Sequence, residues 1–232
     1  MIDFHMHLLP GMDDGARNCR MAAAMIKECE RQEIEAIVAT PHYYFNVKTE
    51  KMIARREKAY NKVVDCLKKT NQQKPEIILG FEVHLAEEVY NENNLGRLLI
   101  GETNTMLVEM PRKKWGDEIF DRLEYLASKG YNIVLAHPER YISIVDEKCY
   151  DRLFSYGFAA QINAASIVNP NLRDFAYKLI EEGKIQVMGS DAHNVGLRAN
   201  FINIACDFIN RRLGEKYTQM MNENAKNFLG IK

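Results

Sequence analysis

The sequence predicts an α/β fold in which parallel strands form a closed barrel surrounded by helices. Short apolar runs alternate along the chain with stretches of helical periodicity, and most histidine-containing motifs directly follow an apolar run. Strands that alternate with helices form parallel sheets covered by helices. A closed barrel brings the carboxyl ends of its strands to one face, where the active sites of such barrels lie. It therefore explains the convergence of six motifs better than an open sheet, whose edge strands end far apart.

Seven runs rich in aliphatic residues are the predicted strands. In chain order they are Ile2–Phe4, Ala36–Ala39, Ile77–Phe81, Met106–Glu109, Ile133–Ala136, Ala159–Ile162 and Ile185–Met188. Other stretches repeat apolar residues at the three- and four-residue spacing of an amphipathic helix. The predicted helices are Met21–Gln32, Glu50–Lys69, Glu118–Lys129, Lys148–Tyr156, Leu172–Glu182, Leu197–Arg212 and Tyr217–Phe228. Glycines such as Gly130 and Gly183 are typical of the points where helices end.

Composition limits the possible classes of protein. The 232 residues contain no linker and no shift in composition, which predicts a single domain over 1–232. A net charge of −1 provides no basic field, so no nucleic-acid partner is expected. No basic-then-apolar leader opens the chain, and no apolar run approaches the roughly 20 residues that span a bilayer, so no membrane insertion is expected. Five widely spaced cysteines without a CxxC motif indicate reduced thiols and a cytoplasmic protein.

Histidines and acidic residues at the predicted strand ends indicate a metal centre. His5 and His7 are two residues apart on the first strand and therefore face the same side. Glu82 and Glu109 each end an apolar run, where an unpaired buried charge would be costly. Imidazole and carboxylate ligands without thiolate suit Mn, Fe or Zn better than a structural cysteine-rich zinc site. The pattern predicts a metallohydrolase that holds several ions.

The motifs resemble those of the polymerase-and-histidinol-phosphatase (PHP) superfamily. The closest resemblance is to its branch of bacterial manganese-dependent tyrosine-protein phosphatases, which act in capsule and exopolysaccharide regulation. It spans essentially the whole chain and rests on Met1–Ala16, Thr40-Pro41-His42, Glu82, Glu109, His137-Pro138-Glu139-Arg140 and Ser190-Asp191-Ala192-His193. The resemblance implies a distorted seven-stranded (β/α)7 TIM-like barrel, the PHP fold, with three metal ions.

The resemblance also implies a role for each site residue. The first ion would be held by His5, His7, Glu82 and Asp191, the second by Glu82, Glu109 and His137, and the third by Asp14, His42 and His193. Arg140 and Arg198 would contact phosphate. Asp13 is the less expected ligand of the acidic pair, because the matching family position directly precedes the glycine. His84 matches no ligand role, and a supporting or surface role is expected for it.

The implied activity is hydrolysis of protein phosphotyrosine by a metal-bound hydroxide in the regulation of capsular and exopolysaccharide synthesis. Two or three manganese ions are expected, with Fe or Zn as alternatives. These ions would outweigh the charge of the carboxylates, attract a phosphate dianion and lower the pKa of bound water. The expected partner is a phosphotyrosine protein, namely the tail of a bacterial tyrosine kinase.

Several other functions share parts of this pattern. A small-molecule phosphatase such as histidinol-phosphatase and a PHP-type nuclease would use the same metals. An amidohydrolase also carries the first-strand HxH, but it normally adds a modified lysine at a strand end, and no predicted strand here ends in lysine. A non-catalytic binding module would not require the complete ligand set.

Two further features complete the prediction. Cys206 and Arg212 satisfy the Cys-x5-Arg pattern of thiol-based tyrosine phosphatases, but the segment is apolar at helical spacing and lacks glycine, so a buried helix is predicted there. Aromatic residues shortly follow several ligand positions and are predicted to line a slot for a phenyl ring. They are Tyr43, Tyr44, Phe45, Trp115 and Tyr141.

Overall fold

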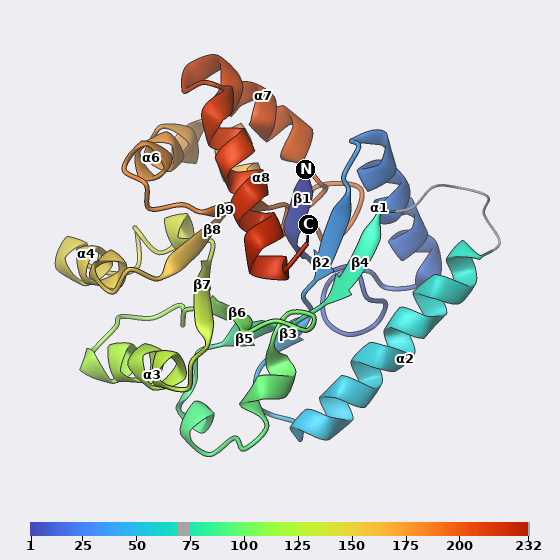
Figure 1. The fold of residues 1–232 in the computed structure, drawn as a ribbon, viewed down its shortest axis with the longest axis horizontal. Helices are drawn as coiled ribbons and strands as arrows, with labels where there is room; N and C mark the ends of the chain where they lie inside the picture. Colours follow the sequence, from blue (N-terminus) through green and yellow to red (C-terminus); the bar gives the residue numbers. More distant parts are fainter. Residues whose placement is uncertain (69–74, 232) are drawn as a thin grey trace.

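The computed structural model describes residues 1–68 and 75–231, and parallel strands form its centre (Figure 1). One sheet has the order β1 (Ile2–Met6), β2 (Ala36–Ala39), β4 (Glu76–Leu79). The other has the order β3 (His42–Tyr43), β5 (Glu82–His84), β6 (Thr105–Glu109), β7 (Asn132–Ala136), β8 (Ala159–Asn163), β9 (Val187–Gly189). Each strand pairing within these sheets is parallel, which confirms the predicted α/β class.

The two sheets meet beside β1. An isolated parallel bridge joins Met6 to Ala192, just past the end of β9. The amide of Asp191 also donates to the carbonyl of His5 over 2.8 Å. The strands therefore curl so that the first and last of them lie next to each other.

The described residues form nine short strands, whereas seven apolar runs were predicted. Thr40 and Pro41 separate β2 from β3, and Gly80 and Phe81 separate β4 from β5. Proline has no amide hydrogen to donate to a ladder. The predicted strand Ile77–Phe81 ends at Leu79, and Glu82 opens the next strand.

Helices surround the strands in Figure 1. The α-helices are α1 (Cys19–Arg31), α2 (Thr49–Leu67), α3 (Asp117–Ser128), α4 (Glu147–Ser155), α5 (Ala164–Val168), α6 (Pro170–Glu181), α7 (Ile202–Arg212) and α8 (Glu215–Leu229). Short 3-10 turns are η1 (Glu87–Tyr90), η2 (Leu95–Leu98) and η3 (Pro138–Arg140). The predicted end of one helix, Lys69, lies outside the described residues.

One helix prediction was wrong in detail, and one short helix was missed. The helix predicted from Leu197 begins at Ile202, because the preceding loop is held in another conformation. The amides of His193 and Asn194 both donate to the carbonyl of Arg198, which closes that loop. The short helix α5 was not predicted, since five residues are too few to display a helical period.

The last helix covers the amino ends of the strands. Phe4, Val38 and Val134 form an inner apolar cluster together with Leu229 of α8. Polar bonds fix the same helix: the amide of Ile2 donates to Asn222 Oδ1 over 2.9 Å, and Thr105 Oγ1 donates to the carbonyl of Phe228 over 3.0 Å. Ile2 and Thr105 are the first residues of their strands. The carboxyl ends of the strands are therefore left free for a site.

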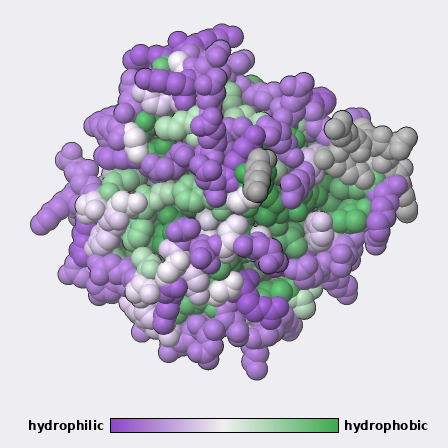
Figure 2. Space-filling model, viewed as in Figure 1, coloured by the Kyte–Doolittle hydropathy of each residue, from purple (hydrophilic) through white to green (hydrophobic). Residues whose placement is uncertain are grey.

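Hydrophilic side chains cover most of the face shown in Figure 2, with hydrophobic ones visible between the outer helices. Within the described ranges, none of the helices combines the length and apolar character needed to cross a membrane.

Candidate metal centre

The nine side chains predicted as ligands lie together at the carboxyl ends of the strands. They form four groups whose potential ligand atoms lie within 4.8 Å of one another. The groups are His7, Asp14, His42 and His193; His5, Glu82 and His137; His5, His7 and Asp191; and His42, Glu82 and Glu109. The parallel sheet explains this convergence, because eight of the nine residues lie at or shortly after the end of a strand or open β3 or β5. Asp14 reaches them from the loop between β1 and α1.

The Glu82 carboxylate is the centre of the cluster. Its Oε2 lies 3.3 Å from Nε2 of both His5 and His7 and 2.9 Å from His42 Nδ1. Its Oε1 lies 2.7 Å from His137 Nε2. Burial alone would raise the pKa of Glu82, but the charge of His5 and the bonds from His137 and His42 hold that pKa well below its usual range. Glu82 is thus an anion that four imidazoles share.

Asp191 connects the His5–His7 pair to an arginine. Its Oδ1 lies 3.3 Å from His7 Nε2, and its Oδ2 accepts hydrogen bonds from Arg140 Nη2 and from Asn163 Nδ2. Asp191 has a φ of 51°, in the left-handed region that non-glycine residues rarely adopt. His137 shares this feature with a φ of 37°. Such backbone strain is found where the surrounding structure fixes functional side chains.

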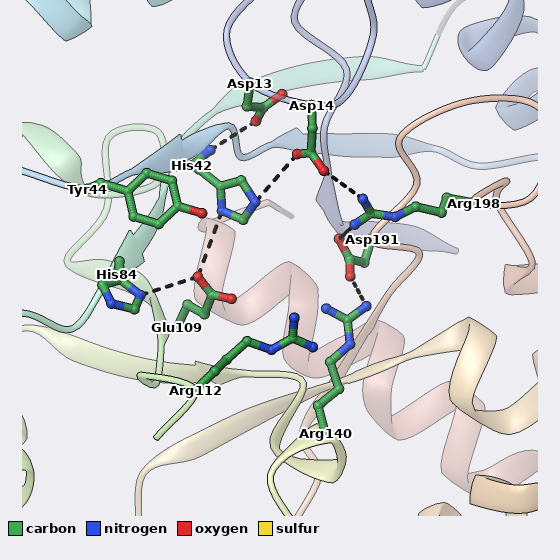
Figure 3. Close-up of a pocket in the computed structure, with 10 residues that line it drawn as sticks. All are labelled: Asp13, Asp14, His42, Tyr44, His84, Glu109, Arg112, Arg140, Asp191 and Arg198. Carbon is green, nitrogen blue, oxygen red and sulfur yellow. Dashed lines mark hydrogen bonds and ion pairs between the residues drawn. The ribbon is translucent and has the colours of Figure 1, made fainter. Parts of the chain in front are cut away.

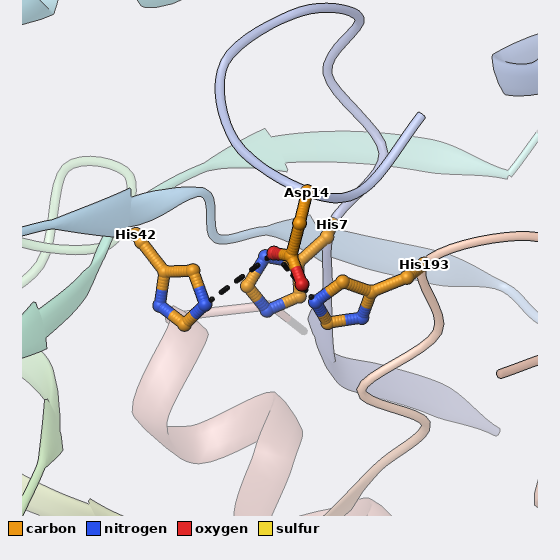
Figure 4. Close-up of side chains that lie close together, drawn as sticks. All are labelled: His7, Asp14, His42 and His193. Carbon is orange, nitrogen blue, oxygen red and sulfur yellow. Dashed lines mark ion pairs between the residues drawn. The ribbon is translucent and has the colours of Figure 1, made fainter. Parts of the chain in front are cut away.

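Figure 4 shows the outermost group, in which Asp14 faces three imidazoles. Asp14 Oδ1 lies 3.2 Å from His193 Nε2 and 3.7 Å from His42 Nε2. The rings of His7 and His193 stack with their centroids 3.8 Å apart. Burial, followed by the charge of His7, lowers the pKa of His193 to about 4, so this imidazole is neutral and can act as a ligand near pH 7.

Supporting residues fix the orientation of the inner histidines. Asp13 Oδ2 lies 2.7 Å from His7 Nδ1 and accepts the amide of His42 over 3.0 Å. Gly15 allows this loop to approach closely, because a Cβ there would lie 2.3 Å from the carbonyl oxygen of His7. On the other side, Gln161 Oε1 lies 3.0 Å from His5 Nδ1. Partners of this kind set which nitrogen of a histidine is available to a metal.

The cluster fits a group of cations. Three of its buried atoms, His42 Nδ1, Glu82 Oε2 and His193 Nε2, make no hydrogen bond of ordinary geometry within the described part of the chain. Buried polar atoms normally have such a partner. In addition, His5 Nε2 and His7 Nε2 face each other at 3.1 Å. Divalent cations between these atoms would supply the missing partners, and imidazole with carboxylate suits Mn, Fe or Zn.

A cavity of about 540 Å³ opens directly above the cluster (Figure 3). It is lined by Asp13, Asp14, His42, Tyr44, His84, Glu109, Arg112, Arg140, Asp191 and Arg198. Both predicted phosphate-binding arginines are present, each paired with an acidic residue. Arg140 binds Asp191, and Arg198 Nη1 donates to Asp14 Oδ2 over 2.8 Å. His84 takes a supporting position, with its Nδ1 3.5 Å from Glu109 Oε2.

Sequence reasoning missed three polar residues of this region. Gln161 and Asn163 lie on β8, where Gln161 Nε2 donates to Asn163 Oδ1 over 2.8 Å and Asn163 in turn holds Asp191. A glutamine inside the apolar run Ala159–Ile162 was the available clue. Arg112 lines the cavity from the loop after β6. It is an exposed residue in a polar loop, and its sequence context did not single it out.

The predicted aromatic slot was mostly wrong. Of the five aromatic residues, Tyr44 lines the cavity, with its ring centroid 5.1 Å from that of His42. Trp115 is buried and donates its indole hydrogen to the carbonyl of Pro111, and Tyr141 is fully buried beside it. Tyr43 is also buried, and Phe45 packs against its ring. These four rings support the loops from inside.

The thiol-phosphatase pattern is a helix, as predicted. Cys206 and Arg212 both lie on α7, and neither lines the cavity. Burial raises the pKa of the Cys206 thiol to about 11, so it does not form a thiolate near pH 7.

The chain is similar to known proteins over nearly its whole length. The family model for the capsular polysaccharide synthesis proteins CpsB/CapC matches residues 1–230. The tyrosine-protein phosphatase YwqE of Bacillus subtilis is 32% identical over 97% of this chain and 90% of its own length. CpsB of Streptococcus agalactiae, also named a tyrosine-protein phosphatase, is 26% identical over 99% of this chain and 98% of its own.

A solved structure shares the fold over nearly the full length. It comes from structural work on YwqE from Bacillus subtilis and CpsB from Streptococcus pneumoniae, two proteins described there as metal-dependent tyrosine phosphatases. The TM-score is 0.84 at 30% sequence identity, over 99% of this chain and 94% of the other. The chain therefore belongs to the CpsB/CapC family of capsular polysaccharide synthesis proteins.

Proposed function

We propose that this protein is a metal-dependent tyrosine-protein phosphatase that acts in capsular and exopolysaccharide synthesis. The observation that carries the proposal is the convergence of nine imidazole and carboxylate ligand candidates beneath an open cavity that both predicted phosphate-binding arginines line. The names of the full-length relatives support the same reaction.

The ligand sets are those that the family resemblance implies. The structure brings together the same nine residues, but it groups His137 with His5 and Glu82, and Glu109 with His42 and Glu82. We propose that His5, His7, Glu82 and Asp191 hold one ion, that Glu82, Glu109 and His137 hold a second, and that Asp14, His42 and His193 hold a third. The proposed metal is manganese, with iron or zinc as alternatives. When bound, the ions would lower the pKa of water at the site so that hydroxide is available near pH 7.

Other side chains of the site bind the phosphate or hold the histidine ligands in position. Arg140 and Arg198 offer guanidinium groups to the non-bridging oxygens of the phosphate, a charge-assisted interaction suited to planar donors. Burial opposes the charge on Arg140, but Asp191 and Glu139 raise its pKa, so the guanidinium stays protonated. Asp13 and Gln161 keep the imidazoles of His7 and His5 in place.

Wider features of the protein are also part of the proposal. The chain would be one domain over 1–232, with its strands arranged as a distorted barrel of seven units. The substrate would be a phosphotyrosine protein such as the tail of a bacterial tyrosine kinase. Five free cysteines support a cytoplasmic location.

Turnover of four substrates in the presence of Mn²⁺ tests the reaction. They are a phosphotyrosine peptide, a phosphoserine peptide, histidinol phosphate and single-stranded DNA, compared by kcat/KM. We expect the phosphotyrosine peptide to be preferred and chelator to abolish turnover. Equal or better hydrolysis of histidinol phosphate would make the protein a small-molecule phosphatase, and cleavage of the DNA would make it a nuclease.

Cys206→Ser tests the class of mechanism. We expect the variant to retain activity within a few-fold, because Cys206 lies on α7 outside the cavity and its thiol stays protonated. The measurement is kcat/KM on an aryl phosphate, with iodoacetamide treatment of the wild type as a parallel test. Complete inactivation of a well-folded variant would contradict the metal-dependent reaction.

Tyr44→Ala tests how the phenyl ring of the substrate is held. Tyr44 is 45% exposed and lies over His42 and His84 at the cavity edge, where it can stack on a substrate ring. Aromatic contacts contribute about 0.5–1.5 kcal/mol, so kcat/KM for a phosphotyrosine peptide should fall about two- to tenfold. Activity on a phosphoserine peptide should change less. Tyr90→Ala is the matched control, because Tyr90 is similarly exposed, at 42%, but packs on Tyr125 away from the cavity.

A further inference from the structure

A second cavity lies beside the one above the candidate metal centre, and the two cavities share part of their walls. This side pocket has a volume of about 470 Å³. Arg112, Arg140 and Arg198 line both cavities, so the two cavities adjoin at these three arginines. Ser143, Ile142 and Leu172 form other parts of the side pocket.

The charges of these arginines differ in how they are compensated. Arg140 is bound to Asp191 and Arg198 to Asp14, two residues that the proposed function also assigns to metal ions. Arg112 makes no hydrogen bond or ion pair with any residue in the described ranges, and in Figure 3 it extends toward the middle of the cavity without a dashed line to a neighbour. A positive charge without a partner therefore stands at the border between the two cavities.

The acidic residue of the side pocket does not neutralise Arg112. Glu139 is fully buried, and its Oε1 accepts the Ser166 hydroxyl over 2.8 Å and the Asn163 amide over 3.1 Å. The wall of the side pocket thus presents more positive than negative charge, together with one hydroxyl group and two aliphatic side chains.

We propose that the side pocket binds a second anionic group of the substrate and that Arg112 is the specificity residue for it. This proposal rests on the proposed phosphatase function, because the first anion is the phosphate at the metal centre. The second anion is a carboxylate or a further phosphate on a residue that flanks the phosphotyrosine. The shared wall places the two anions close together along one extended peptide, in which successive residues advance about 3.3 Å.

Peptides that differ only in the flanking residues test the proposal. Each carries one phosphotyrosine, and glutamate, phosphoserine, alanine or lysine is scanned through the three positions on either side. At one or more positions we expect kcat/KM to be about fivefold higher with glutamate than with alanine, in the range of charge-assisted bonds at a partly exposed site. Phosphoserine should exceed glutamate because it carries more charge. Lysine should be the poorest residue at that position.

Variants assign the effect to the pocket. Arg112→Ala should reduce the glutamate-to-alanine ratio to near one, and Ser143→Glu, which places a carboxylate in the same pocket, should favour the lysine peptide. Lys114→Ala is the matched control, because Lys114 is an exposed cation two residues from Arg112 that lines neither cavity, and it should keep the wild-type ratio.

The possible failures are distinguishable. If the wild type hydrolyses every peptide at the same rate, or if Arg112→Ala lowers kcat/KM for all peptides and for p-nitrophenyl phosphate by one factor, the side pocket is not a second anion site. In the latter case Arg112 serves the reacting phosphate. If the Mn²⁺-loaded wild type hydrolyses neither the peptides nor p-nitrophenyl phosphate, the proposed phosphatase function fails, and with it the basis of this subsite.

Discussion

Glu82→Gln is expected to remove nearly all phosphatase activity and most of the bound metal. Glu82 is fully buried, and its carboxylate lies close to four imidazoles. No other carboxylate of the cluster lies close to as many. Glutamine has the same shape but no charge, so it cannot offset the charge of two cations. We expect kcat/KM to fall by at least about a thousandfold, the upper range for loss of a group that stabilises charge in a reaction.

Metal analysis and activity together decide this prediction. Wild-type protein purified without chelator should contain at least two transition-metal ions per chain, and Glu82→Gln should contain fewer. Glu76→Gln is the matched control, because Glu76 is an exposed glutamate at the start of β4, just before the strand that Glu82 opens. A folded Glu82→Gln protein with wild-type metal content and activity would remove Glu82 from the proposed ligands.

Much of this cluster could be predicted because its residues follow strands. The position of His5 on β1, of His7 directly after it and of Asp191 just after β9 depends on local sequence pattern. The parallel sheet then brings these ends together. The same logic fixed the order of elements and the α/β class. Each of these predictions requires only the alternation of apolar runs and the direction of the strands.

Features that depend on neighbours distant in sequence were not predictable in the same way. Gln161 supports His5 across 156 positions of the chain, and nothing near Gln161 in the sequence indicates that partner. Trp115 and Tyr141 lie in loops near the site, yet they face inward and contact each other. The start of α7 was misplaced because main-chain bonds to Arg198, together with an Asn200 side chain that accepts the Ile202 amide, end the preceding loop.

Arg140→Ala should lower kcat/KM by about a hundredfold while leaving the metal content unchanged. The loss is the size expected for a donor that stabilises the charge of the phosphate as it reacts. Metal content will stay unchanged only if Asp191 keeps its place, because Arg140 also binds Asp191, a proposed metal ligand. Asn163 Nδ2 holds the same Asp191 oxygen at 3.0 Å, so the carboxylate should keep its orientation when the guanidinium is removed.

The Arg140 variants separate phosphate binding from metal binding. Arg140→Lys keeps the charge but loses the planar pair of donors, so it should recover only part of the activity. Arg152→Ala is the control, because Arg152 pairs with Asp117 outside both cavities and should behave as wild type. If Arg140→Ala loses metal in proportion to activity, the arginine acts by positioning Asp191, and the double variant with Asn163→Ala should then add little further loss. If activity falls with metal retained, the guanidinium contacts the phosphate itself, and Arg140→Lys should show the larger share of its defect in kcat.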